Sequence, residues 1–293
     1  MSVTIHQSRC PICGSADISL IRPMLARSRF NLAECRDCVT QFLDPEPSLE
    51  ESHALYGPSY YKSWNMSNGE TDAVRAIKHD TFNRCIRFLQ TFVQQGTILD
   101  VGTATGFFME SATAAGFDAY GVERSEYAAR IAAGKFGVDH IHIGTLESAP
   151  FKPSMFDAVV MTDLLEHVSD PLSTLRRAHA LLKPRGAVLI TTPNVHSFSR
   201  TVMGYRWTHY KAEHLFYFCP KSMAVLAARA GFRIGLLKPL TKTVSIEYLR
   251  SQLSVYRNFL LTPAVHAFKF LPKFFSQQPM RLKMGEMLVI LLK

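Results

Sequence analysis

The sequence predicts an α/β protein in which a doubly wound, mostly parallel sheet follows a small N-terminal zinc ribbon. Two observations support this prediction: strand-like and helical segments alternate from residue 97 onward, and four cysteines form two CxxC pairs near the N-terminus. Alternation of this kind places helices on both faces of a parallel sheet. The chain has 293 residues, of which 47% are hydrophobic and 19% are charged. This composition is typical of a globular protein with its own core and argues against disorder.

The two CxxC pairs predict a metal site. They consist of Cys10 with Cys13 and Cys35 with Cys38, and 21 residues separate the pairs. This arrangement is typical of a four-thiolate zinc ribbon, which we place at residues 1–45. Thiolates would fill all four tetrahedral positions, so we expect the zinc to be structural rather than catalytic. A segment this short buries too little surface to fold without a cross-link such as the bound zinc.

The rest of the chain divides into a linker with an N-terminal helical cap at 46–95 and a main domain at 96–293. In the cap, apolar residues recur at helical spacing between 70 and 94. The main domain shows the pattern of a seven-stranded sheet interleaved with helices. The strands are expected at 97–101, 118–122, 138–143, 156–161, 187–191, 232–238 and 287–292. The helices are expected up to about 115 and at 125–136, 171–182 and 220–230.

Residues 241–284 separate the last two predicted strands and mix aromatic with basic side chains. The pattern predicts a helical insertion that is broken at Pro263 and Pro272. One interpretation is a lid or a dimer surface over a ligand cleft. The other is a basic amphipathic surface that makes peripheral contact with anionic lipid.

The formal net charge of +9 is unevenly distributed, because residues 171–293 carry 19 basic and only 3 acidic side chains. Such a basic part indicates an anionic partner (a phosphorylated substrate, a membrane surface or a nucleic acid) or simply a solvated basic face. The first ten residues lack the basic and apolar regions of a signal peptide, and no stretch of about 18 uncharged apolar residues predicts a spanning helix. We therefore expect a cytoplasmic protein, with peripheral membrane contact as the alternative. The oligomeric state is left open.

A loop of small residues, Gly102-Thr103-Ala104-Thr105-Gly106, lies between the first predicted strand of the main domain and the helix that follows. Small residues allow the backbone to approach a ligand closely at a helix N-terminus. The second strand ends at Glu123, 21 residues after Gly102. An acid at this separation is suited to hold the hydroxyls of a ribose. The two features together predict a site for a nucleotide or a related cofactor.

These motifs and those that follow them resemble class I S-adenosylmethionine-dependent methyltransferases over about residues 95–240 and the last strand. The matching segments are 100–106, Glu123, 144–151, 156–160, 165–171, 182–186 and 192–194. The resemblance implies a Rossmann-like methyltransferase fold and S-adenosylmethionine as cofactor. It implies cofactor contacts from Asp100, Gly102, Thr103, Ala104, Gly106, Glu123, Arg124, Thr145, Leu146, Glu147, Thr162 and Leu164.

The chain departs from the family pattern at two of these positions. Ala104 replaces a glycine that is common in the loop, which is a small steric change. Thr145 stands where many relatives have an aspartate that faces the adenine amino group. That contact would fall to Thr145, to Glu147 or to the backbone of Leu146.

Transfer of a methyl group to a hydroxyl usually needs a base, and histidine is suited to this near neutral pH. His167, His209 and His214 follow predicted strands that end at the carboxyl edge of the sheet, where open α/β sheets bind their ligands. We expect His214 to act as the base or to bind the acceptor, with His167 and His209 as further catalytic candidates. Each of them could instead be a structural histidine with satisfied hydrogen bonds.

The segment Leu165–Pro171 is typical of the branch that resembles ubiquinone-biosynthesis O-methyltransferases and sugar methyltransferases. It implies a small-molecule, sugar or saccharide-carrier acceptor, methylated on oxygen. The first alternative is an RNA methyltransferase that uses the ribbon to bind its substrate. The Asp/Asn-Pro-Pro-Tyr/Phe run of base-amino methyltransferases is absent, because Thr162-Asp163-Leu164 follows the fourth strand. The second alternative, a non-enzymatic zinc-ribbon protein, is disfavoured by the intact glycine loop.

Overall fold

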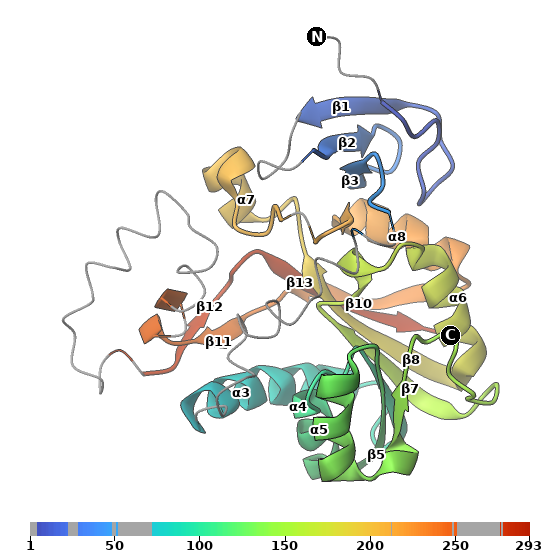
Figure 1. The fold of residues 1–293 in the computed structure, drawn as a ribbon, viewed down its shortest axis with the longest axis vertical. Coiled ribbons are helices and arrows are strands. Elements are labelled where there is room, and N and C mark those ends of the chain that lie inside the picture. Colours follow the sequence, from blue (N-terminus) through green and yellow to red (C-terminus); the bar gives the residue numbers. More distant parts are fainter. Residues whose placement is uncertain are drawn as a thin grey trace.

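The computed structural model describes residues 5–22, 29–48, 51, 72–211, 213–247, 249–250, 276 and 278–293. Residues 52–71 of the predicted linker and residues 251–275 of the predicted insertion lie outside these described residues. The described parts form a seven-stranded sheet with helices on both faces, a second sheet of four strands at the N-terminus and a two-stranded ladder (Figure 1).

The main sheet has the strand order β10-β13-β8-β7-β4-β5-β6. Its strands are β4 (Gly96–Val101), β5 (Phe117–Glu123), β6 (Ile141–Ile143), β7 (Phe156–Thr162), β8 (Leu182–Pro193), β10 (Arg233–Pro239) and β13 (Glu286–Leu292). All neighbouring pairs are parallel except those that involve β13, which runs antiparallel to both β8 and β10. The mostly parallel, seven-stranded sheet predicted from the sequence is therefore confirmed.

Two hydrophobic cores, one on each face of the sheet, make the fold doubly wound. One core packs the sheet against α3 (Asp72–Leu89), α4 (Phe107–Ala114) and α5 (Glu126–Phe136). The other packs it against α6 (Pro171–Leu181) and α8 (Pro220–Arg229). Successive strand residues alternate between the two cores, as Val159 and Val160 do. The short helices α7 (Phe198–Met203), η2 (Val138–His140), η3 (Leu165–His167) and η4 (Gly204–Arg206) lie in the connections.

The N-terminal sheet joins the predicted ribbon to a distant part of the chain. Its order is β1 (Ile18–Arg22), β2 (Asn31–Cys35), β3 (Gln41–Asp44) and β9 (Phe216–Tyr217). In the antiparallel pair β3–β9, Gln41 lies opposite Tyr217 and Phe42 opposite Phe216. The ribbon also shares one hydrophobic core with α6 and α8. The structure thus attaches the ribbon to the main domain by a main-chain ladder that the sequence did not indicate.

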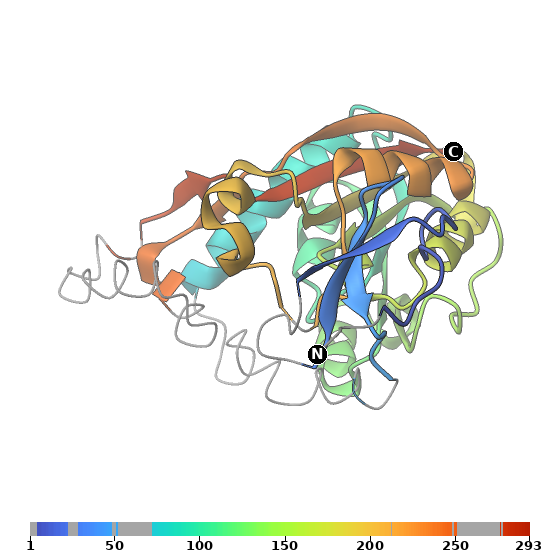
Figure 2. The same ribbon diagram turned by 90° about the horizontal axis from the view of Figure 1, so that it is seen from above.

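The two ends of the segment 241–284 are strands, where the sequence predicts helix. β11 (Lys242–Val244) and β12 (Met280–Leu282) pair antiparallel and extend the sheet beyond β10 and β13 in both views (Figures 1 and 2). The β-branched residues Thr243 and Val244 favour a strand, and the backbone N–H of Thr243 donates to the Thr81 hydroxyl of α3 at 2.9 Å. Within the described residues, no helix is both long enough and apolar enough to cross a membrane.

Candidate active site

The candidate site lies at the carboxyl edge of the main sheet. β4 pairs with β5 on one side and with β7 on the other, so the connections that leave these strands diverge between β4 and β7. In open α/β sheets, ligands bind in the crevice outside the carboxyl ends of the strands at such a switch point. The carboxyl ends of β4, β5 and β7 and the loops after β4, β5, β6 and β7 carry all the residues predicted to bind a cofactor.

The glycine loop after β4 is tight and close to its neighbours. The backbone N–H groups of Gly102 and Thr103 both donate to the Val122 carbonyl, at 2.8 and 3.1 Å. Gly102 and Gly106 have φ angles of 76° and 89°, and Ala104 has 48°. A Cβ on Gly106 would lie 2.7 Å from the Phe136 ring. The loop therefore requires glycine at this end, where α4 begins.

Glu123 ends β5 with its carboxylate against this loop. One carboxylate oxygen accepts the Ala104 N–H at 2.9 Å, and the other accepts the Ser125 N–H at 2.7 Å. The side chain is buried. Since each carboxylate oxygen has two lone pairs, a group fixed in this way is suited to accept further hydrogen bonds from a pair of ribose hydroxyls.

Asp100, at the carboxyl end of β4, is a buried acid without a complete set of partners. It is 1% exposed, and its Oδ1 has no hydrogen-bond partner among the described residues. Burial raises the pKa of Asp100 to about 7, and the nearby charge of Glu123 adds to the rise. Such an orphaned acceptor beside the loop fits a ligand that brings a positive charge or a donor, as S-adenosylmethionine does.

The loop after β6 contains the residues that were predicted to contact the adenine of the cofactor. The Thr145 hydroxyl accepts the Ser148 N–H at 3.3 Å, so it stabilises the turn itself. Glu147 is exposed and accepts a hydrogen bond from the Thr174 hydroxyl at 3.2 Å. Leu146 is buried in the core, which fixes its backbone at the edge of the site. The adenine contact itself stays a prediction for Thr145, Glu147 or the Leu146 backbone.

The remaining residues predicted to bind the cofactor also lie at the carboxyl edge of the main sheet. Arg124 is exposed directly after β5, and Thr162 ends β7 half-buried. A Cβ on Gly102 would lie 3.0 Å from a methyl group of Leu164, so Leu164 covers the glycine loop from the β7 side. Thr162 and Leu164 therefore lie across the switch point from the loop.

Two of the three histidines predicted to be catalytic are in ring contact after the carboxyl end of β7. The ring centroids of His167 and His214 are 4.6 Å apart, and the rings are nearly perpendicular. His167 lies in η3, where its Nδ1 hydrogen-bonds to the Glu213 carbonyl at 2.8 Å. His214 precedes β9. Burial lowers the pKa of His167, and it lowers that of His214 to well below the usual value. Burial therefore favours the neutral form of both rings, and a neutral imidazole has one nitrogen lone pair.

Glu166 lies with these two histidines and is not among the site residues predicted from the sequence, where it stands only as a possible structural partner of His167. It is 1% exposed, and burial raises its pKa to about 8. Its side chain and those of His167 and His214 each offer one ligand atom, and these atoms all lie within 4.8 Å of one another. We call these three residues the Glu-His-His cluster. By residue type and distance, they could hold a metal ion.

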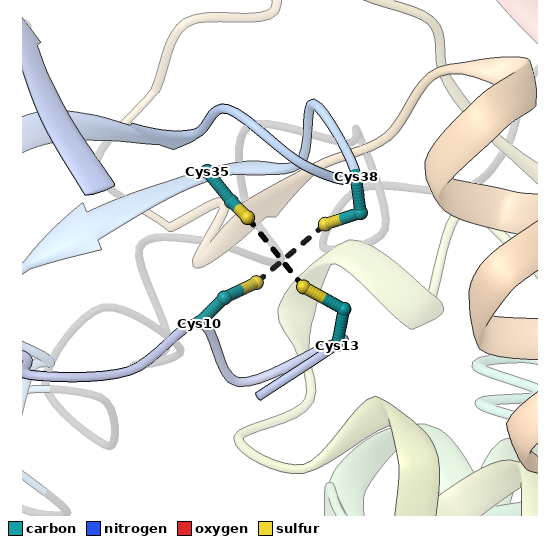
Figure 3. A group of neighbouring side chains, drawn as sticks. All are labelled: Cys10, Cys13, Cys35 and Cys38. Carbon is teal, nitrogen blue, oxygen red and sulfur yellow. Dashed lines mark hydrogen bonds between the residues drawn. The ribbon is translucent and has the colours of Figure 1, made fainter. Parts of the chain in front are cut away.

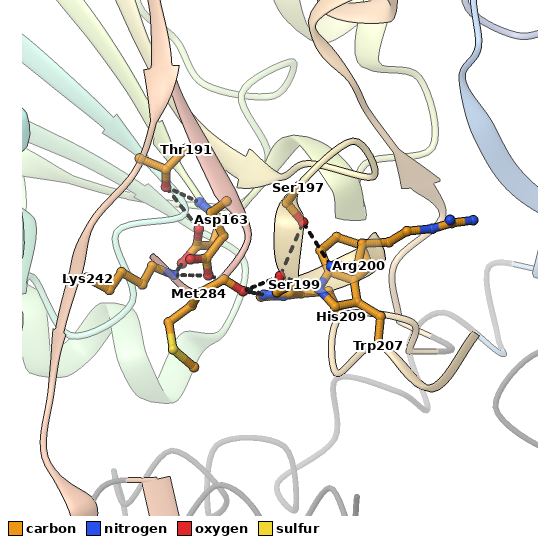
Figure 4. Close-up of polar contacts among 10 residues, drawn as sticks. Asp163, Thr191, Ser197, Ser199, Arg200, Trp207, His209, Lys242 and Met284 are labelled. Atoms are coloured by element: carbon orange, nitrogen blue, oxygen red, sulfur yellow. Dashed lines mark hydrogen bonds and ion pairs between the residues drawn. The ribbon is translucent and has the colours of Figure 1, made fainter. Parts of the chain in front are cut away.

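A partly buried ionic network, also missed from the sequence, joins Lys242 to two acids (Figure 4). The Lys242 ammonium lies 2.7 Å from carboxylate oxygens of both Asp163 and Glu286. Burial opposes ionisation of Asp163, but Lys242 and Thr191 outweigh it and lower the pKa of this acid. His209 belongs to this network: its Nε2 lies 3.3 Å from the Met284 carbonyl and 3.7 Å from Glu286. Burial lowers the pKa of His209 as well.

The four predicted metal-binding cysteines converge (Figure 3). The Sγ atoms of Cys10 and Cys38 are 3.6 Å apart, those of Cys13 and Cys35 are 3.5 Å apart, and all four lie within 4.8 Å of one another. Tetrahedral zinc with Zn–S bonds of about 2.3 Å would separate its sulfurs by about 3.8 Å. The distances fit a four-thiolate zinc site.

Each cysteine pair closes a tight turn that holds its thiols in place. The Gly14 N–H donates to the Cys10 carbonyl, and the Val39 N–H donates to the Cys35 carbonyl, both at 2.8 Å. The residue after each pair has a positive φ angle, 82° at Gly14 and 62° at Val39. The two cysteine pairs are therefore held by the same kind of backbone turn.

Comparison with known proteins agrees with this geometry. A family model for the methyltransferase domain matches residues 77–236, more than half of the chain. The ubiquinone biosynthesis O-methyltransferase of Pseudomonas paraeruginosa is 31% identical over 130 residues, which cover 43% of this chain and 54% of that protein. The protein of the same name from Thiobacillus denitrificans is 31% identical over 171 residues, which cover 51% of this chain and 72% of that protein. The chain thus spans about half the length of the first of these relatives.

Solved structures show the same fold. A SAM-dependent methyltransferase from Thermotoga maritima superposes with a TM-score of 0.52 at 19% identity and covers 82% of this chain and 99% of its own. The YcgJ protein from Bacillus subtilis superposes with a TM-score of 0.52 at 15% identity and covers 73% of this chain and 98% of its own. The chain belongs to the methyltransferase domain family, and its fold is that of the class I S-adenosylmethionine-dependent methyltransferases.

Proposed function

We propose that this protein transfers a methyl group from S-adenosylmethionine to a hydroxyl of a small-molecule, sugar or saccharide-carrier acceptor. The observation that carries the proposal is the pairing of two features at one sheet edge. A glycine loop with Glu123 and the orphaned Asp100 lies on one side of the switch point. The buried Glu-His-His cluster follows β7 on the other. The names of the two O-methyltransferase relatives support oxygen as the methylated atom.

The residues divide the chemistry between cofactor and acceptor. When bound, S-adenosylmethionine supplies an electrophilic methyl group. Glu123 would hold the ribose hydroxyls, and Asp100 would face the positive charge of the cofactor. His214 would contact the acceptor, as its base or as a binding residue, because a neutral imidazole offers a lone pair. Alignment of the acceptor oxygen with the methyl group supplies much of the acceleration in such a transfer.

The acceptor class can be tested with a labelled cofactor. The full-length chain would be incubated with S-adenosylmethionine carrying a radiolabelled methyl group and with an extract of its host. We expect the label in the small-molecule or organic-soluble fraction. Label in the nuclease-sensitive fraction would contradict the proposal and favour the RNA alternative, which the comparisons do not support. The basic part at 171–293 favours an anionic acceptor, and peripheral membrane contact through 241–284 stays a prediction.

The pKa of Asp100 predicts how cofactor affinity depends on pH. This acid has a pKa of about 7 in the free protein, and a cationic ligand favours its ionised form. Binding then requires loss of a proton below pH 7, so the affinity for S-adenosylmethionine falls by up to about tenfold per pH unit between pH 7 and 5. Calorimetric titration across this range measures the slope, and Asp100→Asn should flatten it. A wild-type affinity that does not change with pH would contradict this role.

We further propose that the four cysteines bind structural zinc and that the ribbon braces the acceptor side of the site. Leu215, next to His214, connects the two: its N–H donates to the Glu166 carbonyl at 2.8 Å, and its carbonyl accepts the Leu43 N–H of the ribbon at 3.0 Å. The Tyr210 hydroxyl adds a bond to the Gln41 side chain at 2.7 Å. The segment that carries His214 is therefore held between β3 and η3.

Removal of zinc should consequently affect the acceptor side more than the cofactor side. In Cys13→Ala, we expect loss of bound zinc, faster hydrogen exchange at 207–219 and loss of most turnover, with little change in cofactor affinity. Hydrogen exchange by mass spectrometry resolves the segments. Cys85→Ala, which alters a buried thiol of α3 outside the ribbon, is the matched control. Equal exchange at 207–219 in both variants would contradict the bracing role.

A further inference from the structure

We propose that Lys135 and Glu110 are positioning residues for the cofactor, because they hold the glycine loop in the conformation that binds S-adenosylmethionine. Lys135 lies in the last turn of α5, and Glu110 lies in the first turn of α4, which begins directly after the loop. Neither is among the site residues predicted from the sequence. Both act through the main chain of the loop. The inference rests on the proposed function, since it takes S-adenosylmethionine as the ligand of the loop.

The Lys135 ammonium joins the loop to the helix that follows it. Its Nζ donates to the Thr105 carbonyl at 2.8 Å and lies 2.9 Å from a carboxylate oxygen of Glu110. It also lies 5.1 Å from the ring centre of Phe107, the first residue of α4. A hydrogen bond from a charged donor is stronger than one from a neutral donor. Lys135 therefore fixes the main chain at the point where the loop becomes a helix.

Glu110 is held in turn by two residues of α3. The Arg75 guanidinium donates to both carboxylate oxygens, at 2.7 and 3.2 Å, and the Nε2 of His79 lies 3.0 Å from Oε2. Burial opposes ionisation of Glu110, but Arg75 and Lys135 outweigh it and lower the pKa of this acid. A network of several charges holds its geometry better than an isolated surface pair does. Three helices, α3, α4 and α5, thus meet at Glu110 and support the ammonium of Lys135.

The loop needs this support because its conformation is unfavourable for one of its own residues. Ala104 has a φ angle of 48°, in the left-handed region where a side chain is disfavoured. Glu123 accepts the Ala104 N–H at 2.9 Å, and Lys135 holds the carbonyl of the next residue, Thr105. Two charged side chains therefore bind the main chain on either side of the left-handed residue. Loss of either should lower the fraction of molecules whose loop is in the binding conformation, and the apparent affinity falls by the same factor.

Calorimetric titration of Lys135→Met with S-adenosylmethionine tests the role of the ammonium. Methionine keeps most of the side-chain length but removes the charged donor. We expect the affinity to fall by about tenfold, as for the loss of one charged hydrogen bond. Lys135→Arg keeps a charged donor and should recover most of the affinity. Arg130→Met is the matched control, because it removes the same charge from the same helix at a residue that forms an exposed ion pair with Glu126.

A double-mutant cycle tests whether Glu110 acts through Lys135. Glu110→Gln removes the charge that attracts the ammonium, so it should weaken cofactor binding in the wild-type background. In the Lys135→Met background, the same change should cost little further affinity, because the residue through which it acts is already absent. Additive losses in the two backgrounds would overturn the positioning role of Glu110.

Hydrogen exchange without the cofactor tests the loop itself. Relative to the wild type, Lys135→Met should exchange faster at 102–110 and at the same rate in β7, which lies in the core. Wild-type affinity in Lys135→Met would overturn the proposal. Faster exchange in β7 as well would also overturn it, since it shows a general loss of stability. Absence of S-adenosylmethionine binding in the wild type, together with faster exchange at 102–110 alone in the variant, would refute the proposed function and leave the support of the loop standing.

Discussion

Replacement of His214 by alanine is expected to lower turnover by at least about 100-fold, the usual effect of losing a group that handles the acceptor proton or oxygen. His214 is 5% exposed and lies within the Glu-His-His cluster, in the segment before β9 rather than in a loop that carries predicted cofactor residues. The affinity for S-adenosylmethionine should therefore change little. Single-turnover rates with labelled cofactor measure the first quantity, and calorimetry measures the second.

The matched control for His214 is His196→Ala, because His196 follows the same sheet edge but is exposed. Its turnover should equal that of the wild type. Unchanged turnover in His214→Ala would remove His214 from the chemistry. A parallel loss of cofactor affinity would show that the variant disturbs the whole edge of the sheet rather than the acceptor side alone.

Replacement of Glu123 by alanine should weaken S-adenosylmethionine binding by at least about 100-fold. Hydrogen bonds to a charged group contribute about 1.5–3 kcal/mol each, and two ribose hydroxyls would lose their acceptor. The change also frees the N–H groups of Ala104 and Ser125, which the carboxylate now holds at 2.9 and 2.7 Å. Loosening of the glycine loop adds to the loss. Calorimetric titration of the variant gives the affinity directly.

Two further variants separate charge from position. Glu126→Ala removes an exposed acid three residues along, which pairs with Arg130 on the surface of α5, and should bind the cofactor as the wild type does. Glu123→Gln keeps one acceptor oxygen and should fall between the wild type and Glu123→Ala. Wild-type affinity in Glu123→Ala would mean that the ribose is held elsewhere.

The main sheet could be predicted from the sequence because its signals are local. Buried strands such as β7 are short apolar runs, and helices such as α6 begin at a capping residue, Asp170, followed by Pro171. The glycine loop and Glu123 could be predicted for the same reason. The glycines are required by the backbone conformation of one turn, and Glu123 stands at the end of one strand.

The acceptor side depends on contacts between distant residues, and these leave little trace in local sequence. Lys242 meets Asp163 across 79 positions of the chain, and the β3–β9 ladder joins Gln41 to Tyr217. A two-residue strand such as β9 has no periodicity to detect. One signal was available: Glu286 is one of only three acids in the basic part at 171–293, and an acid among so many basic residues indicates an ionic partner.

The central claim, methylation of a hydroxyl on a small molecule, is tested most directly by the bond that carries the transferred methyl group. The labelled product made by the full-length protein from the small-molecule fraction of a host extract would be purified and heated with hydroiodic acid. This reagent cleaves methyl ethers and releases volatile methyl iodide. We expect the label to leave as methyl iodide. Label that stays with the product would show a methyl group on carbon or nitrogen and contradict O-methylation.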